Sequence, residues 1–296
     1  MGNFTATLHT KQIKAMLSIG GANASPYTFS KMASTKSNRA AFIKSTIEVA
    51  RKYGFDGLDL NWEYPMTPED MSNFSSLIGQ WRTAIDMEAS TTKLPRLLLS
   101  AAVYFAPKFF FSDIQPEYPA DAIRKYMDFV SPMCFDYHGG WNATITGEPA
   151  LLYDSTSNIS TSYGIESWIN AGVPPKKLVV GLPLYGRTWQ LKDPNVNGIG
   201  APAVGIGPGS GIMPYTDVVD FNVNNNATVV YDKKTVSTYS YAGTTWIGYD
   251  DQLSITGKVE YAYYNGLGGY FFWVIGQDKN WTLSKQASVA WDNSGV

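Results

Sequence analysis

Short apolar runs alternate with helical periods along most of this chain. The apolar runs are nearly continuous and of strand length, and they cover residues 15–19, 55–62, 97–103, 129–135, 178–184 and 269–274. Runs of this kind are typical of parallel strands that are buried on both faces. Helical spacing or helix-start signals lie before, between and after them, at residues 4–12, 38–53, 67–85, 120–126, 159–171 and 281–290. The alternation predicts an α/β fold with a parallel sheet and helices outside it.

The pattern changes between residues 188 and 261. This stretch is rich in Gly, Pro, Asn and Thr, with short β-type runs at 228–231 and 244–249. It keeps too many aromatic residues to be a disordered linker. We therefore expect a small α+β subdomain at residues 188–261, inserted into a larger domain that residues 1–187 and 262–296 form.

The number of predicted strands is six, whereas a closed (β/α)8 barrel needs eight. The chain is therefore either an open sheet or a barrel without two of its strands. A doubly wound sheet would normally begin with a strand, but this chain begins with the predicted helix at 4–12. That order favours a barrel whose beginning is missing.

Composition argues against several classes of function. Charged residues make up 16% of the chain and the formal net charge is −2, so nothing favours binding to nucleic acid or to an anionic membrane surface. No apolar run approaches the about 18 residues that suggest a membrane-spanning helix. No motif implies a metal or an organic cofactor, and a monomer is expected. The single cysteine, Cys134, cannot form an internal disulfide, and its apolar neighbours predict a buried, inert thiol.

Aromatic residues make up 14% of the chain, which a packed core explains for the most part, although an excess of Trp and Tyr also suits a site that stacks on sugar rings. The chain also has seven N-glycosylation sequons, whereas chance would give roughly two or three. The asparagines that begin them are Asn3, Asn23, Asn73, Asn142, Asn158, Asn226 and Asn280. The excess favours a secretory history. Residues 1–5 lack the basic and apolar regions of a signal peptide, so none is expected within this chain.

The densest polar cluster lies at residues 56–65, which read Asp-Gly-Leu-Asp-Leu-Asn-Trp-Glu-Tyr-Pro. Side chains alternate along a strand, so Asp59, Asn61 and Glu63 share one face, and the intervening apolar residues face the helices. Polar side chains at the carboxyl end of a barrel strand indicate an active site. The structural alternative is a buried polar network that only supports the barrel. A metal site is disfavoured, because the chain has two histidines and neither lies in this segment.

This segment resembles the D-G-x-D-x-D-x-E signature of glycoside hydrolase family 18, the chitinase family. Further segments resemble motifs of that family in the same order: LSIGG at 17–21, MCFD at 133–136 followed by GGW at 139–141, GLPLYGR at 181–187, and GGYFFW at 268–273. The match spans essentially the whole chain and is strongest with plant class V chitinases. The resemblance implies a (β/α)8 TIM-barrel-type fold lacking its first two strands, with an α+β insertion before the last strand. It implies an N-terminally truncated family member.

The resemblance also implies an activity, which is hydrolysis of the β-1,4-linked N-acetylglucosamine chains of chitin and chitooligosaccharides. Configuration is retained because the acetamide oxygen of the sugar attacks its own anomeric carbon. Glu63 would be the general acid, and Asn61 stands where the family has an aspartate that orients the acetamide. Asp59 would stand behind Asn61, Asp136 would help to hold the sugar that is cleaved, and Trp273 would stack under it. The other substrate-binding residues that the resemblance implies are Tyr64, Met133, Phe135, Tyr185, Arg187 and Trp141.

Two residues depart from the family pattern. Asn61 keeps an oxygen that can accept the acetamide N–H but lacks the negative charge, and losing such stabilisation of a transition state typically costs about 10²–10³ in rate. Phe135 stands where the family usually has tyrosine, so a hydroxyl expected to bond the acetamide is missing, at about 1 kcal/mol. Binding through aromatic stacking should suffer less than catalysis.

Three interpretations stay open. A chitinase-type hydrolase with reduced activity is favoured by Glu63, and a catalytically impaired, lectin-like protein that binds chitin oligosaccharides is favoured by Asn61 and Phe135. A truncated chain that folds poorly is favoured by the missing strands. The resemblance and the sequons together predict a plant glycoprotein of carbohydrate metabolism that is secreted or vacuolar.

Overall fold

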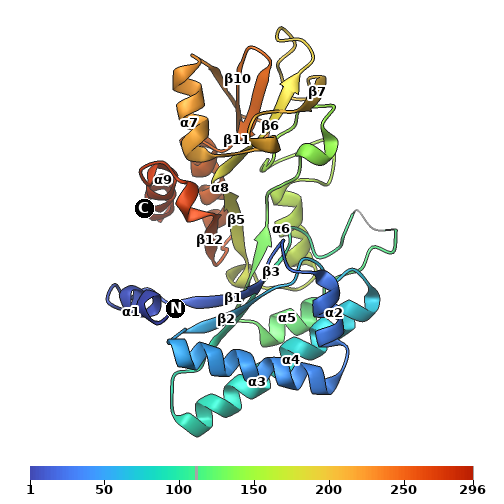
Figure 1. Cartoon of the computed structure of the whole chain (residues 1–296), viewed down its shortest axis with the longest axis vertical. Helices are drawn as coiled ribbons and strands as arrows, with labels where there is room; N and C mark the ends of the chain where they lie inside the picture. Colours follow the sequence, from blue (N-terminus) through green and yellow to red (C-terminus); the bar gives the residue numbers. More distant parts are fainter. Residues whose placement is uncertain (111–112, 296) are drawn as a thin grey trace. The chain divides into compact units, whose positions relative to one another are not determined.

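The computed structural model describes residues 1–110 and 113–295, and within them the chain divides into two compact units (Figure 1). Unit 1 contains Met1–Pro132 and Ser167–Leu178, and unit 2 contains Met133–Glu166 and the chain from Val179 onward. Two sheets carry the strands that the apolar runs predict. Strands β1 (Met16–Gly20), β2 (Gly57–Asn61), β3 (Leu98–Tyr104) and β4 (Phe129–Met133) form a four-stranded sheet in that order, and β5 (Val179–Pro183) pairs in parallel with β12 (Gly269–Trp273).

In unit 1, helices cover a face of the four-stranded sheet, and Figure 1 shows α3 and α4 running along it. The helices of this unit are α1 (Gly2–His9), α2 (Pro26–Ala33), α3 (Lys36–Tyr53), α4 (Pro68–Thr92), α5 (Ala120–Tyr126) and the short turn η2 (Pro175–Lys177). The Thr67 side chain caps α4 by accepting from Asp70 N, and Gly54 ends α3 with φ +71°, as their sequence signals predict.

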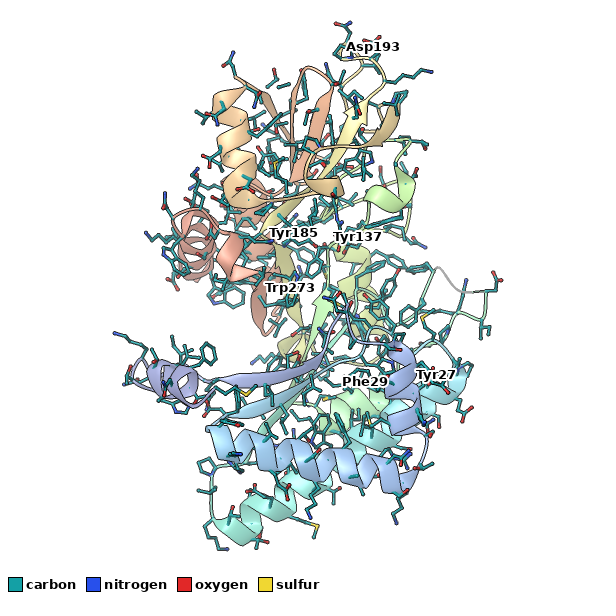
Figure 2. The ribbon with its side chains drawn as sticks, viewed as in Figure 1. Tyr27, Phe29, Tyr137, Tyr185, Asp193 and Trp273 are labelled. Carbon is teal, nitrogen blue, oxygen red and sulfur yellow. The ribbon has the colours of Figure 1, made fainter. Side chains whose placement is uncertain are left out.

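The alternation of side chains along β2 is as predicted. Leu58, Leu60 and Trp62 are at most 1% exposed, because they form the core between the sheet and its helices. The Trp62 ring stacks 5.9 Å from Phe29 of α2, which Figure 2 labels, and lies 6.5 Å from Phe74 of α4. Asp59 and Asn61 are thereby left on the opposite face of β2, which ends at Asn61.

Besides the pair β5 and β12, unit 2 contains a larger sheet. Its strand order is β7-β6-β11-β10-β9, and β8 pairs with β6. Its strands are β6 (Tyr185–Leu191), β7 (Ala203–Ile206), β8 (Ile212–Pro214), β9 (Thr228–Asp232), β10 (Ser237–Ala242) and β11 (Thr245–Tyr249). Helix α6 (Thr161–Asn170) belongs to unit 2 as far as Glu166 and to unit 1 from Ser167. The remaining helical elements are α7 (Tyr215–Asn224), α8 (Gln252–Tyr264), α9 (Thr282–Asn293) and the short turns η1 (Gly140–Asn142), η3 (Gly209–Gly211) and η4 (Ile275–Gln277). The predicted β runs at 228–231 and 244–249 correspond to β9 and β11. The division of the chain into a subdomain at 188–261 and a domain at 1–187 and 262–296 stays a prediction.

Two other expectations concern single features. Cys134 is free and 1% exposed, and burial raises the pKa of its thiol to about 12, which confirms a buried and unreactive cysteine. Among the helices of the described residues, none combines the length and apolar character that crossing a membrane requires.

A buried ion pair joins α8 to the end of β11. Lys258 donates to Asp250 Oδ1, and the two side chains are 2% and 1% exposed. The second oxygen, Oδ2 of Asp250, has no partner among the described residues. Burial raises the pKa of Asp250, although the Lys258 charge opposes that rise. The carboxylate therefore depends on Lys258 as its counter-charge.

Lys258→Met should lower the free energy of unfolding by about 3–5 kcal/mol, because it leaves a buried carboxylate unpaired. Urea unfolding followed by far-UV circular dichroism measures the loss. The double variant Lys258→Met/Asp250→Leu removes both charges and should recover most of it. A Lys258→Met protein as stable as the unmodified chain would contradict this account of the pair.

Candidate active site

The ends of β1 and β2 approach so closely that only glycine fits at position 20. A Cβ on Gly20 would lie 2.0 Å from the backbone oxygen of Asn61, and the φ of Gly20 is +119°. Gly21 N then donates to the same Asn61 oxygen at 2.8 Å, and its φ is +96°. This backbone contact fixes the position of Asn61 at the carboxyl end of β2.

Asp59 is held from both neighbouring strands. The register places Ser18 of β1 and Ser100 of β3 opposite it. Ser18 Oγ donates to Oδ2 at 2.6 Å, and Ser100 Oγ donates to Oδ1 at 2.7 Å. Burial raises the pKa of Asp59, while the two hydroxyl hydrogen bonds oppose the rise. Both carboxylate oxygens therefore have donors, yet ionising Asp59 still carries a desolvation cost.

Asn61 is 7% exposed, and its side-chain oxygen Oδ1 accepts no hydrogen bond from the described residues. An acceptor left unpaired in the interior costs about 1–3 kcal/mol. A ligand N–H placed against this oxygen would recover that energy. The side chain is thus a buried acceptor on the face of β2 that carries Asp59.

Glu63 lies two residues after Asn61 and is partly exposed. The next residue, Tyr64, packs edge-on against Tyr104 at 5.7 Å and Phe109 at 5.4 Å between ring centroids. Tyr118 beside them is 2% exposed, and burial, followed by the charges of Tyr64 and Glu63, holds its pKa well above the ordinary value. Glu63 therefore precedes a tyrosine that is packed among aromatic rings, and its charge acts on Tyr118 of the same group.

A second group of predicted residues lies in unit 2, around an ion pair. Arg187 donates from Nε to Asp136 Oδ1 at 2.8 Å, and its Nη2 lies 2.7 Å from the same oxygen. The guanidinium also lies over the rings of Trp141 and Tyr185, with its carbon 5.1 and 5.5 Å from their centroids. Burial raises the pKa of Tyr185 well above its ordinary value, and the Asp136 charge adds to the rise. The tyrosine hydroxyl therefore stays protonated.

Phe135 contacts two aromatic rings edge-on, with centroids 6.3 Å from Tyr185 and 6.2 Å from Phe271. A Cβ on Gly181 of β5 would lie 2.7 Å from the Phe135 ring and 2.8 Å from the Phe271 ring. Glycine at this position therefore makes the space that both rings occupy.

Three tryptophans of unit 2 are more than half exposed, and two of them belong to the predicted site. Trp141 is 62% exposed and Trp273 is 52% exposed. Trp273 ends β12 opposite Pro183, and its backbone oxygen accepts from Leu184 N at 2.8 Å, which places it near Tyr185 (Figure 2). Met133 is partly exposed at the end of β4. Exposed indoles of this kind are available for stacking against a ligand ring.

The structure therefore groups the predicted residues in two sets. Asp59, Asn61, Glu63 and Tyr64 belong to unit 1, and the set in unit 2 consists of Met133, Phe135, Asp136, Trp141, Tyr185, Arg187 and Trp273. Sequence reasoning missed Ser18, Ser100 and Tyr118 as neighbours of the first set, although a serine at an inward position of an apolar run was a usable signal. Within the described ranges, no three or more His, Cys, Asp or Glu residues are grouped so that they could hold a metal ion.

Comparison with known proteins gives the class of this chain. The model of the glycosyl hydrolases family 18 matches residues 2–278, and the chain belongs to that family. A class V chitinase of Lotus japonicus is 57% identical over 282 residues, which are 95% of this chain and 71% of that protein.

Solved structures show the same TIM-barrel-type fold. A glutamate-to-glutamine mutant of a class V chitinase from Nicotiana tobaccum, in complex with NAG4, matches with a TM-score of 0.94 and 40% identity, over 98% of this chain and 84% of that chain. A chitinase-like agglutinin from Robinia pseudoacacia matches with a TM-score of 0.90 and 43% identity, over 98% and 85%. The six parallel-sheet strands described here are thus part of a barrel-type fold, which has eight in its complete form.

Asp59→Asn should stabilise the protein at about pH 7. Because the folded state raises the pKa of Asp59 above its ordinary value of 3.8, the folded protein binds this proton more tightly than the unfolded chain does. The stabilisation that this bound proton provides is fully present below pH 3.8, and it is lost as the pH rises through the raised pKa. Asparagine stays neutral and can still pair with both serines.

Urea unfolding at about pH 7 and about pH 4 measures this effect. The variant should be more stable than the unmodified chain at the higher pH, and the difference should shrink at the lower pH. Asp121→Asn is the matched control, because that side chain is 89% exposed and should show no comparable change. A loss of stability on Asp59→Asn at neutral pH would show that the ionised form is the preferred one.

Proposed function

We propose that this chain is a chitinase-type glycoside hydrolase that cleaves β-1,4-linked N-acetylglucosamine chains, with a turnover reduced by Asn61 and Phe135. One observation carries the proposal. The buried Oδ1 of Asn61 accepts no hydrogen bond from the described residues and lies on the same face of β2 as Asp59, two residues before Glu63. The acetamide N–H of an N-acetylglucosamine unit is a donor of the kind that this oxygen lacks.

In the proposed mechanism, Asn61 Oδ1 accepts the acetamide N–H and turns the acetamide oxygen toward the anomeric carbon. That oxygen attacks the carbon, while Glu63 gives its proton to the glycosidic oxygen and the bond to the leaving chain breaks. The cyclic oxazolinium ion that results is then opened by a water molecule, which Glu63, now ionised, deprotonates. Two displacements at the same carbon retain its configuration.

Asp59 supplies negative charge in the proposed mechanism. Its charge stands two residues from Asn61 on the same face, and Ser18 and Ser100 donate to both of its oxygens. It is thus the anionic group proposed to stand behind Asn61 when the oxazolinium forms. Asn61 itself is neutral, so the stabilisation of this cation is weaker than with an aspartate at position 61.

The residues of unit 2 are proposed to bind the sugar chain. Trp273 offers an exposed indole for stacking under the sugar that is cleaved, and Trp141 offers a second one. Asp136, Tyr185 and Arg187 would supply hydrogen bonds, and Met133 and Phe135 an apolar wall. The complex of the Nicotiana chitinase mutant with NAG4 supports this class of ligand.

A lectin-like protein that binds chitin oligosaccharides without cleaving them is the second candidate. The neutral Asn61 favours it, because a buried acceptor is enough for binding, whereas catalysis needs the charge. The likeness to the chitinase-like agglutinin of Robinia supports the same alternative. A chain that does not fold independently is the third.

Location and assembly are part of the proposal. Six of the seven sequon asparagines are exposed, all but Asn73 in α4, which supports a glycoprotein that is secreted or vacuolar. We infer a monomer that acts on carbohydrate, with residues 188–261 as an inserted subdomain.

Cleavage of chitohexaose tests the function directly. The unmodified chain should cut it slowly, Glu63→Gln should not cut it, and Asn61→Asp should raise kcat by about 10²–10³ because it restores the charge. Glu69→Gln is the matched control, because Glu69 is an exposed glutamate in the first turn of α4 and should leave kcat unchanged. Chromatography of the products gives the rates.

Two outcomes would contradict the hydrolase. No cleavage by the unmodified chain, together with binding of chitohexaose at about micromolar Kd by calorimetry, would favour the lectin. A thermal scan without a cooperative transition would favour the chain that does not fold independently.

A further inference from the structure

One sequon asparagine lies directly beside a proposed sugar-binding residue. Asn142 follows Trp141 in the turn η1 and begins the sequon Asn142-Ala143-Thr144. Asn142 and Thr144 are both exposed. Thr144 Oγ1 donates to Asn142 Oδ1 at 3.0 Å, and no hydrogen bond among the described residues uses Nδ2 of Asn142. The amide nitrogen that accepts an N-linked glycan therefore has no competing partner.

The backbone around Asn142 is held in place. Asn142 N donates to Gly139 O at 2.9 Å, and Trp189 Nε1 donates to Asn142 O at 3.1 Å. The Trp141 ring is also fixed, because Arg187 lies over it and because its edge occupies the space that a Cβ on Gly139 would need, at 2.5 Å. A glycan attached to Asn142 would therefore begin directly beside the Trp141 indole.

We propose that Asn142 carries an N-linked glycan and that the root of this glycan is a tethered ligand for Trp141. In the modification step, Nδ2 displaces the pyrophosphate of a lipid-linked oligosaccharide at the first sugar's anomeric carbon. The C–N bond forms, the C–O bond to the lipid pyrophosphate breaks, and the amide proton leaves to a base. The root of such a glycan is two β-1,4-linked N-acetylglucosamine units, which is the disaccharide of chitin.

Under the proposed function, this disaccharide competes with the substrate for the surface of Trp141. In this respect the inference rests on the proposed function. A ligand on a short flexible tether has an effective concentration of the order of mM. A single stacked sugar binds an exposed indole weakly, so even this concentration fills the surface of Trp141 only part of the time. We therefore expect the glycan to lower the affinity for chitotetraose by about two- to ten-fold rather than to abolish binding.

Another exposed sequon of unit 2 supplies the control. Asn158 is exposed in the loop before α6, and it is not adjacent in sequence to any residue of the proposed sugar-binding set. A glycan there shares the chemistry of the glycan on Asn142 but lacks the neighbouring indole. Asn158→Gln should therefore leave the affinity for chitotetraose unchanged.

The test uses the full chain made in the secretory pathway of a plant host. Mass spectrometry after enzymatic deglycosylation in heavy-oxygen water measures occupancy at Asn142. Calorimetry then compares the intact glycoform, the form trimmed to one N-acetylglucosamine, and Asn142→Gln. Both trimming and Asn142→Gln should raise the affinity for chitotetraose by about two- to ten-fold, because each removes the tethered disaccharide.

Three results would overturn the proposal. They are an unoccupied Asn142, an affinity that does not change on trimming, and an equal gain on trimming in the Trp141→Ala variant, where stacking on the indole is impossible. Failure of the proposed function has a different signature, since the unglycosylated chain made in bacteria would then not bind chitotetraose at all. Occupancy by mass spectrometry is independent of either binding result.

Discussion

The close contact between Gly20 and the backbone of Asn61 is the constraint on which the first half of the site depends. A side chain at position 20 would meet the Asn61 oxygen at 2.0 Å, so any other residue would force β1 away from β2. The same pairing sets the register that puts Ser18 opposite Asp59. The position of Asn61 and the hydroxyl that holds Asp59 thus both follow from the absence of a side chain on one glycine.

Unit 1 keeps its polar groups at a cost in stability. Burial opposes the ionisation of Asp59, and Oδ1 of Asn61 accepts no hydrogen bond from the described residues. Apolar residues at these positions would bury more easily, as Leu58 and Leu60 do on the other face. Buried polar groups that the fold does not need are typical of sites where function opposes stability. A ligand that supplies an N–H to Asn61 would remove part of this cost.

The sequence predicts the regular parts of the fold well and the irregular parts poorly. The six apolar runs correspond to β1 to β5 and β12, because short apolar runs between helical periods mark the strands. The burial on both faces that such runs predict does not hold for β1 and β12, whose residues are only partly buried or exposed. Helix α2 was missed because only Phe29 and Ala33 of its eight residues are buried, which is too few for a period. Helix α8 was missed because Lys258 lies on its buried side, and only the fold brings Asp250 to that charge.

The candidate site shows the same limit. Alternation along β2 is enough to place Asp59 and Asn61 on one face, whereas Glu63 lies beyond the end of the strand and its place on that face stays a prediction. The pairing of Asp136 with Arg187 joins residues 51 positions apart, and no local pattern predicts it. The serine clamp on Asp59 likewise needs the register of three strands.

The two departures from the family pattern act on different parts of the energy. Phe135 fits a space bounded by Tyr185 and Phe271, with Gly181 leaving room for the ring, so losing the hydroxyl leaves the packing of this aromatic pocket intact. Asn61 keeps the shape and the acceptor of an aspartate and loses only its charge. Shape, stacking surface and hydrogen-bond acceptors stabilise bound substrate and transition state alike, whereas the charge matters most when the cation forms. We therefore propose that Asn61 acts mainly on the barrier to cleavage and largely spares binding, whereas the missing hydroxyl at Phe135 weakens binding and cleavage alike.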